Sequence, residues 1–168
     1  MENLEKRGKQ KRNLMTAHTK TILEENLRQT TLRLNESQLA IGEAAGRESD
    51  WHDNAAFDYA NMECDLNSAK LANLERKLQN PEIILPRQEV NEVSVGNTVV
   101  VRFQDKSDEE TFTILGPDDG GKKPGWLSYL SPLAISLIGK KEGETAEFSV
   151  GEREKYKVSI VKILSGNF

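Results

Sequence analysis

The stretch FDYANMECDLNSAKLANLERKL, residues 57–78, carries small and apolar side chains at alternating spacings of three and four residues. The positions are Phe57, Ala60, Cys64, Asn67, Leu71, Leu74 and Leu78. On an α-helix this rhythm places every one of them on one face, as in the heptad repeat of a coiled coil. The stretch therefore predicts a long helix that packs against a partner along one seam.

A partner helix is predicted immediately upstream. The same rhythm runs through Leu23, Leu27, Thr30, Leu34, Ser37 and Ile41. Residues 45–49 separate the two patterns, and their glycine and short polar side chains suit a turn. We expect residues 1–80 to form an antiparallel coiled-coil hairpin with its tip near residues 46–53. A first helix of about 34 residues would extend on the order of 50 Å.

The composition changes at Pro81, because all five prolines and nine of the twelve glycines lie from there onward. Short runs of strand-forming residues separated by turn signals follow. They are residues 98–103, 111–115, 126–129, 146–150 and 156–163. Residues 81–168 are therefore predicted to form a second domain, a small antiparallel sheet, and the fold class is α+β.

One short helix is predicted between these strands, over residues 131–139. Ser131 suits the N-cap, Pro132 the first helical position and Gly139 the residue just past the end. Leu133 and Leu137 are expected to pack into the core of the domain.

Several classes of protein are excluded by composition. The chain of 168 residues holds one cysteine and two histidines, which cannot complete a four-ligand zinc site or an intrachain disulfide. It has no apolar run long enough to span a membrane, and its first residues are charged, unlike a secretory signal. We expect a cytoplasmic protein with no membrane partner.

The predicted hairpin tip carries the residues best suited to chemistry. Asp50 and Asp53 are three apart, so on a helix their carboxylates share a face and could hold Mg²⁺ with ligands from elsewhere. The alternative is that both acids cap a helix N-terminus. Trp51 lies between them, and a tryptophan at a solvated tip more often marks a contact surface.

Two segments resemble the GreA/GreB family of bacterial transcript cleavage factors. Residues 49–57, Ser-Asp-Trp-His-Asp-Asn-Ala-Ala-Phe, are similar to the family's Gly-Asp-Leu-x-Glu-Asn-Ala-Glu-Tyr tip. Residues 131–144, from Ser131-Pro132 to Glu144, are similar to its Ser-Pro-hydrophobic-small-basic-x-Leu-hydrophobic-Gly-basic segment. The similarity extends from about residue 14 to about residue 164, over most of the 168-residue chain.

This resemblance implies a function carried out on a partner. In the family the hairpin enters the secondary channel of bacterial RNA polymerase, near the 3′ end of the nascent RNA in the elongation complex. The tip carboxylates, here Asp50 and Asp53, would hold a second Mg²⁺ jointly with the polymerase, which then cuts backtracked RNA. The globular domain would be FKBP-like and dock outside the channel, with Ser131 and Pro132 near the docking surface and Trp51 as a further contact. The chain would thus be an accessory factor and not an enzyme by itself.

The tip departs from the family pattern in several places. Asp53 replaces a glutamate and reaches one methylene less far, Ser49 replaces a glycine, and one extra residue precedes Asp50. Ala56 and Phe57 replace an acid and a tyrosine, and Ile135 replaces a basic residue in the second segment. Two alternatives follow: a non-cleaving relative that occupies the same channel and inhibits the polymerase, or an unrelated coiled-coil adaptor whose tip acids only cap a helix.

Overall fold

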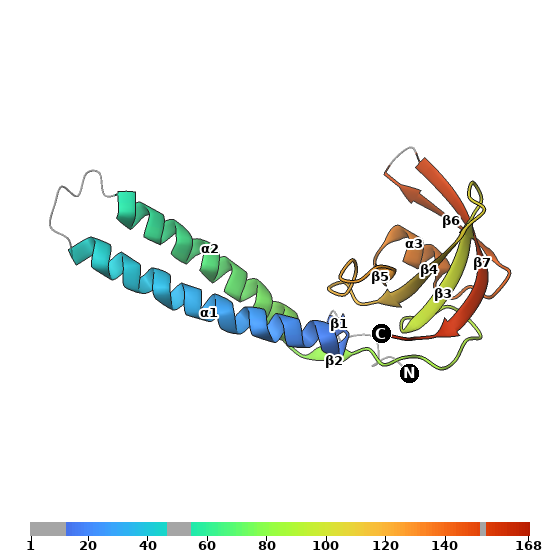
Figure 1. The fold of residues 1–168 in the computed structure, drawn as a ribbon, viewed down its shortest axis with the longest axis horizontal. Coiled ribbons are helices and arrows are strands. Elements are labelled where there is room, and N and C mark those ends of the chain that lie inside the picture. The colour runs from blue at the N-terminus through green and yellow to red at the C-terminus, as the bar shows by residue number, and fades with distance from the viewer. Residues whose placement is uncertain (1–12, 47–54, 152–153) are drawn as a thin grey trace, which may run out of the picture. The chain divides into compact units, whose positions relative to one another are not determined.

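A computed structural model of the protein describes residues 13–46, 55–151 and 154–168. The chain forms two compact units (Figure 1). The helical unit is Lys20–Asn80, and the sheet unit combines Pro81–Phe168 with the residues up to Thr19. Residues 13–19 therefore belong with the C-terminal sheet, whereas the sequence analysis assigned all of residues 1–80 to the hairpin.

The helical unit consists of α1 (Ala17–Gly46) and α2 (Ala55–Leu78), which lie antiparallel as predicted (Figure 1). The predicted seam positions are the least exposed ones: Leu23, Ser37, Ala60 and Asn67 are buried, and the other seam residues are half-buried. α2 ends next to Asn80, which adopts a left-handed φ of 51° directly before Pro81. Asparagine tolerates this conformation better than other non-glycine residues do, so it stops the helix.

The sheet unit is built on five strands. They are β3 (Asn97–Phe103), β4 (Glu109–Leu115), β5 (Trp126–Ser128), β6 (Thr145–Val150) and β7 (Glu154–Ser165), in the spatial order β5-β4-β3-β7-β6. All neighbours are antiparallel except β4 and β5, which pair in parallel. The predicted α+β fold class is confirmed, with this one parallel pair as a difference in detail.

The main core lies between the sheet and α3 (Pro132–Leu137). Alternation along the strands turns Val99 and Val101 of β3 and Val158 and Ile160 of β7 inward, where they are fully or almost fully buried. Leu133 and Leu137 of α3 complete this cluster, as expected for its apolar side.

A two-stranded parallel ladder, which the sequence analysis did not predict, forms on the N-terminal side of the sheet unit. β1 (Asn13–Met15) pairs with β2 (Pro81–Ile83), with Leu14 opposite Glu82. Leu14 also packs beside a second apolar cluster formed by Ile84, Leu115 and Trp126. Residues distant in sequence are thereby brought to the start of α1.

Asp119, between β4 and β5, is completely buried and accepts hydrogen bonds from the other end of the chain. Its carboxylate accepts from the Thr16 N–H at 3.1 Å, from the Thr16 hydroxyl at 2.7 Å and from the Gly116 N–H at 3.0 Å. The Thr16 hydroxyl oxygen in turn accepts from the Thr19 N–H at 3.1 Å, which caps the first turn of α1. The sheet unit therefore fixes the start of the first helix.

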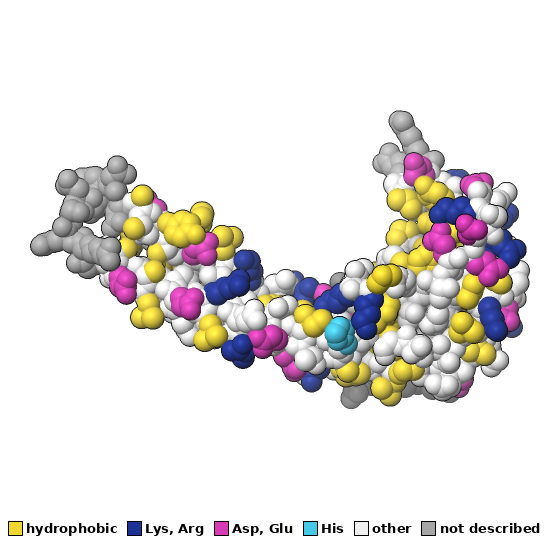
Figure 2. Space-filling view, viewed as in Figure 1, with side chains coloured by type: hydrophobic (Ala, Val, Ile, Leu, Met, Phe, Trp, Pro, Cys, Tyr) yellow, Lys and Arg dark blue, Asp and Glu magenta, His cyan; other side chains and the backbone are white. Residues whose placement is uncertain are grey.

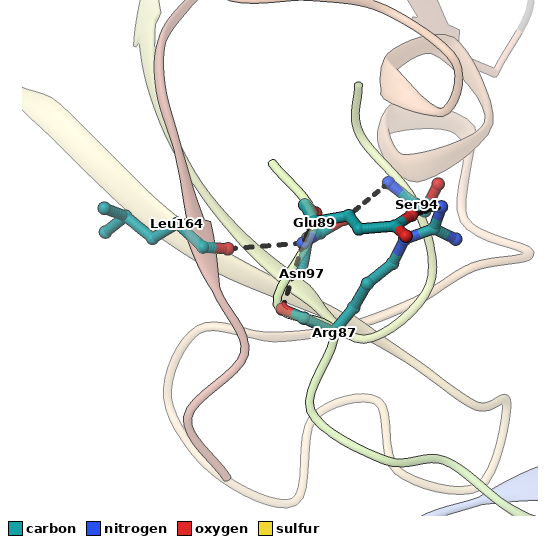
Figure 3. Close-up of polar contacts among 5 residues, drawn as sticks. All are labelled: Arg87, Glu89, Ser94, Asn97 and Leu164. Atoms are coloured by element: carbon teal, nitrogen blue, oxygen red, sulfur yellow. Dashed lines mark hydrogen bonds and ion pairs between the residues drawn. The ribbon is translucent and has the colours of Figure 1, made fainter. Parts of the chain in front are cut away.

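A second buried polar residue, Asn97, organises the loop before β3 (Figure 3). Its side-chain oxygen accepts from the Ser94 N–H at 3.0 Å, and its amide donates to the Glu89 carbonyl at 2.9 Å. The same amide lies 3.4 Å from the Leu164 carbonyl of β7. One side chain thus ties a loop without regular structure to the sheet.

We expect Asp119→Ala to destabilise the sheet unit by about 3 kcal/mol, because it leaves the Thr16 and Gly116 donors buried without an acceptor. Urea unfolding followed by Trp126 fluorescence, in a Trp51→Phe background, measures the change. Asp105→Ala, at an exposed carboxylate, is the matched control and should change stability by less than about 0.5 kcal/mol. Equal effects of the two substitutions would contradict the structural role of Asp119.

Two glycine substitutions should have opposite effects. A Cβ on Gly116 would lie 1.9 Å from the Leu14 carbonyl oxygen, whereas a Cβ on Gly42, within α1, meets no atom within 4 Å. Gly116→Ala should therefore destabilise the sheet unit, and Gly42→Ala should stabilise α1 by about 0.5–1 kcal/mol because alanine favours the helix. Thermal unfolding followed by circular dichroism tests both signs, and stabilisation by Gly116→Ala would refute the tight packing of β1 on this loop.

Candidate functional site

The predicted tip site lies outside the described residues. Asp50, Trp51 and Asp53 belong to the segment between the end of α1 at Gly46 and the start of α2 at Ala55. Their roles therefore stay predictions.

The second predicted site, Ser131 and Pro132, begins α3. The Ser131 hydroxyl accepts from the Ala134 N–H at 3.2 Å, so Ser131 is the N-cap as predicted, and Pro132 occupies the first helical position. Gly139, with a φ of +82°, follows the end of the helix. Its N–H donates to the Val93 carbonyl at 2.8 Å, which anchors the end of α3 to the loop before β3.

α3 has two opposite sides. Leu133, Ala134 and Leu137 face the core, whereas its other side exposes large apolar groups. Ile135 is 62% exposed, and Leu130 and Ile138 are 48% and 39% exposed. With the exposed ring of Pro132, these residues form what we call the α3 surface (Leu130, Pro132, Ile135 and Ile138). Neighbouring exposed apolar side chains of this kind mark interaction sites.

Sequence reasoning located the helix but missed most of its exposed apolar residues. Leu130 and Ile138 were not singled out, and Ile135 was noted only as the replacement of a basic residue. The usable signal was the helical period. With Leu133, Ala134 and Leu137 assigned to the core, Ile135 must lie on the opposite side of the helix. The exposed side of α3 is thus apolar where the resemblance expected a charge.

The resolved electrostatic features of the helical unit are local surface pairs. The pKa of the Glu25 carboxyl is lowered to about 2, first because the Arg28 side chain donates hydrogen bonds to it and second because the Gln29 amide does so. All three residues are exposed on α1, so the shift reflects helix-surface pairing and not a reactive centre.

Within the described residues, no cluster of three or more histidine, cysteine, aspartate or glutamate side chains is arranged to hold a metal ion. Among the helices that the structure describes, none has the length and apolar character needed to cross a membrane.

Comparison with known proteins supplies the family. The profile described as "Transcription elongation factor, GreA/GreB, C-term" matches residues 87–165. The chain is 30% identical over 150 residues to "Transcription elongation factor GreA" of Streptococcus mutans, covering 89% of this chain and 93% of the relative. It is 31% identical over 125 residues to the protein of the same name in Treponema pallidum, covering 74% and 76% respectively. The solved structure of the transcription factor Gfh1 aligns at 20% identity with a TM-score of 0.41, covering 89% of this chain and 95% of that one.

The architecture is that of an α+β protein with a helical hairpin unit and a curled sheet unit that exposes apolar side chains on a short helix. The sequence matches make the assignment specific. The chain belongs to the GreA/GreB family of transcription elongation factors.

Proposed function

We propose that this chain binds bacterial RNA polymerase and stimulates cleavage of backtracked nascent RNA, which rescues arrested elongation complexes. The observation that carries the proposal is the 30% identity to a relative named transcription elongation factor GreA, spread over 89% of the chain. Such an alignment must extend into both units, so it relates the helical hairpin as well as the sheet. The unrelated coiled-coil adaptor is therefore no longer a competing hypothesis.

In this proposal the tip residues work in the polymerase active site. Asp50 and Asp53 would be ligands of a Mg²⁺ ion held jointly with the polymerase, since two carboxylates supply too few oxygens for an octahedral ion. The ion would supply an activated water and neutralise charge on the phosphate. The carboxylates of this chain would orient the ion and the water, and the secondary channel would admit the hairpin near the RNA 3′ end.

The sheet unit would dock on the polymerase through the α3 surface. Four exposed groups on and beside a helix of six residues, three of them large aliphatic side chains, are suited to fill an apolar depression on a partner. The N-cap of Ser131 and the anchoring of Gly139 fix that helix at both ends, so the surface is held ready for binding. Trp51 would provide a further contact at the tip.

The second candidate function is inhibition of the polymerase by a channel-occupying chain that does not promote cleavage. The observation that favours it is the altered tip, where Asp53 is one methylene shorter than the glutamate of the family pattern and an extra residue precedes Asp50. A displacement of about 1 Å at a catalytic group can lower a rate by about a hundredfold.

We expect Asp50→Asn to abolish cleavage stimulation while leaving polymerase binding nearly unchanged, and Asp53→Asn to weaken cleavage less. Asparagine caps a helix about as well as aspartate but lacks the charge that holds Mg²⁺. The measurement is the cleavage rate of a backtracked complex across a Mg²⁺ titration. Asp53→Glu, which restores the reach, should lower the Mg²⁺ concentration required.

Two outcomes would count against this assignment. Wild-type cleavage by Asp50→Asn at low Mg²⁺ would refute the metal-binding role. No stimulation by the wild-type chain at any Mg²⁺ concentration, with binding intact, would favour the inhibitor.

The docking role of the α3 surface is tested separately. Ile135→Glu should weaken the affinity of the full chain for core polymerase by about tenfold or more, as for an apolar hot spot. Leu85→Glu, at an aliphatic side chain 74% exposed elsewhere on the sheet unit, is the control. If both substitutions have the same effect on the dissociation constant, the α3 surface is not the docking site.

A further inference from the structure

The helical unit contains a groove between α1 and α2 that none of the described residues fills. Its volume is about 460 Å³, within the range of about 300–1,000 Å³ typical of ligand pockets. The small residues lining it are Ser37, Ala40, Ala44, Ala56 and Ala60. Because these side chains are short, they leave space in the groove for side chains of another molecule.

Large apolar side chains surround this groove instead of closing it. Tyr59 lines the groove and is 62% exposed, and Met62 and Leu66 continue from it along α2 at helical spacing. On α1, Leu32 and Leu39 each precede by four residues a glutamate of the groove wall, which makes them neighbours of that wall on the helix surface. Figure 2 shows hydrophobic side chains on the surface of this unit together with acidic ones.

The floor of the groove also presents a polar group without a partner. Asn67 is only 4% exposed and lines the groove, yet its amide forms no hydrogen bond with any described residue. Ser37, the other buried polar residue of the floor, donates instead to the carbonyls of its own helix. The groove leaves this amide within reach of solvent, so a polar group of a bound molecule can form hydrogen bonds with it.

The charges of the groove wall identify what can occupy it. Glu36, Glu43 and Glu63 line the groove with a single cation, Arg33, and none of the three carboxylates forms an ion pair with a described residue. A second copy of this chain would bring three more carboxylates to the same face, and RNA would bring phosphates. A protein segment with lysine or arginine beside its apolar side chains complements the wall.

We propose that this groove is a docking site for a basic amphipathic helix of a partner protein. Aliphatic side chains of that helix fill the space above the alanine floor, flanking lysine or arginine residues pair with the three glutamates, and a polar side chain bonds the Asn67 amide. Small residues on the floor allow the close approach of a third helix. The proposal rests on residues other than the tip carboxylates and the α3 surface, so peptide binding tests it without a measurement of transcript cleavage.

The probe is a synthetic leucine and lysine peptide about five turns of helix long, with leucine on one face. Binding to the full chain is measured by fluorescence anisotropy and compared with a leucine and glutamate peptide of the same pattern. We expect the lysine peptide to bind at least about tenfold more tightly, with an affinity that falls as salt rises. Equal binding of the two peptides would overturn the proposal.

Matched variants locate the site. Glu43→Lys should weaken binding of the lysine peptide about tenfold, whereas Asp65→Lys, the same kind of change at an exposed acid of α2 outside the groove, should change it by less than about twofold. Equal weakening by both variants would mean that the peptide is held by general charge attraction, and would contradict binding in the groove. If the wild-type chain self-associates and Leu39→Ser abolishes this, the occupant of the groove is a second copy of the chain. That result would contradict a separate partner protein.

Asn67→Leu separates a binding role from a structural one. It replaces an amide that bonds no described residue by an apolar group of similar size, so it should not lower the Tm of the free chain but should weaken peptide binding about tenfold. A residue that only stabilised the hairpin would lower the Tm when replaced. Unchanged peptide binding by Asn67→Leu would refute the docking role of the groove floor.

Discussion

The carboxylate of Asp119 is the constraint on which the sheet unit and the start of α1 both depend. It is completely buried and accepts hydrogen bonds from the N–H and the hydroxyl of Thr16, a residue 103 positions away in the sequence. A polar group buried in such a place is stable only when it is hydrogen-bonded, so the loop between β4 and β5 depends on residues from the N-terminal side. The pairing of β1 with β2 and the contact of Leu14 with the second apolar cluster bring those residues there. Helix capping is thereby a tertiary interaction in this chain.

The two units satisfy their hydrophobic residues in different ways. In the sheet unit, alternation buries one side of each strand against α3, so the core closes on itself. Among the described residues of the helical unit, only small or polar side chains and Leu23 are buried, and five large apolar side chains are exposed. Two helices alone offer each other one narrow seam, too little to cover every apolar residue. The helical unit therefore keeps part of its apolar surface exposed, as the sheet unit does at the α3 surface, and both are consistent with roles completed by a partner.

How much the sequence revealed depended on periodicity. The main strands and α3 were predictable, because β3 is a run of strand-forming residues, β7 alternates, and Ser131, Pro132 and Gly139 mark both helix ends. β1 and β2 were not, since three residues are too few to show a period. Asp119 precedes two glycines, as a turn residue does, and only the fold shows that it bonds Thr16. Asn67 was placed correctly on the seam, but its position in the floor of a groove is visible only in three dimensions.

Charge placement connects the proposed activities of the hairpin. Carboxylates near the cleavage site can be useful only where a metal ion offsets them, because otherwise they repel the RNA backbone. The proposed mechanism gives no such ion to Glu36, Glu43 and Glu63. The face that carries them is therefore best suited to bind a basic protein, and we expect the RNA to lie along another face of the hairpin. Arg33 lines both this groove and a neighbouring one toward the base of the helices, where Lys70 joins it and no carboxylate lines the wall. The charge of the lining residues thus changes from acidic to basic between the two grooves. This change would orient a bound helix with its basic end toward the tip.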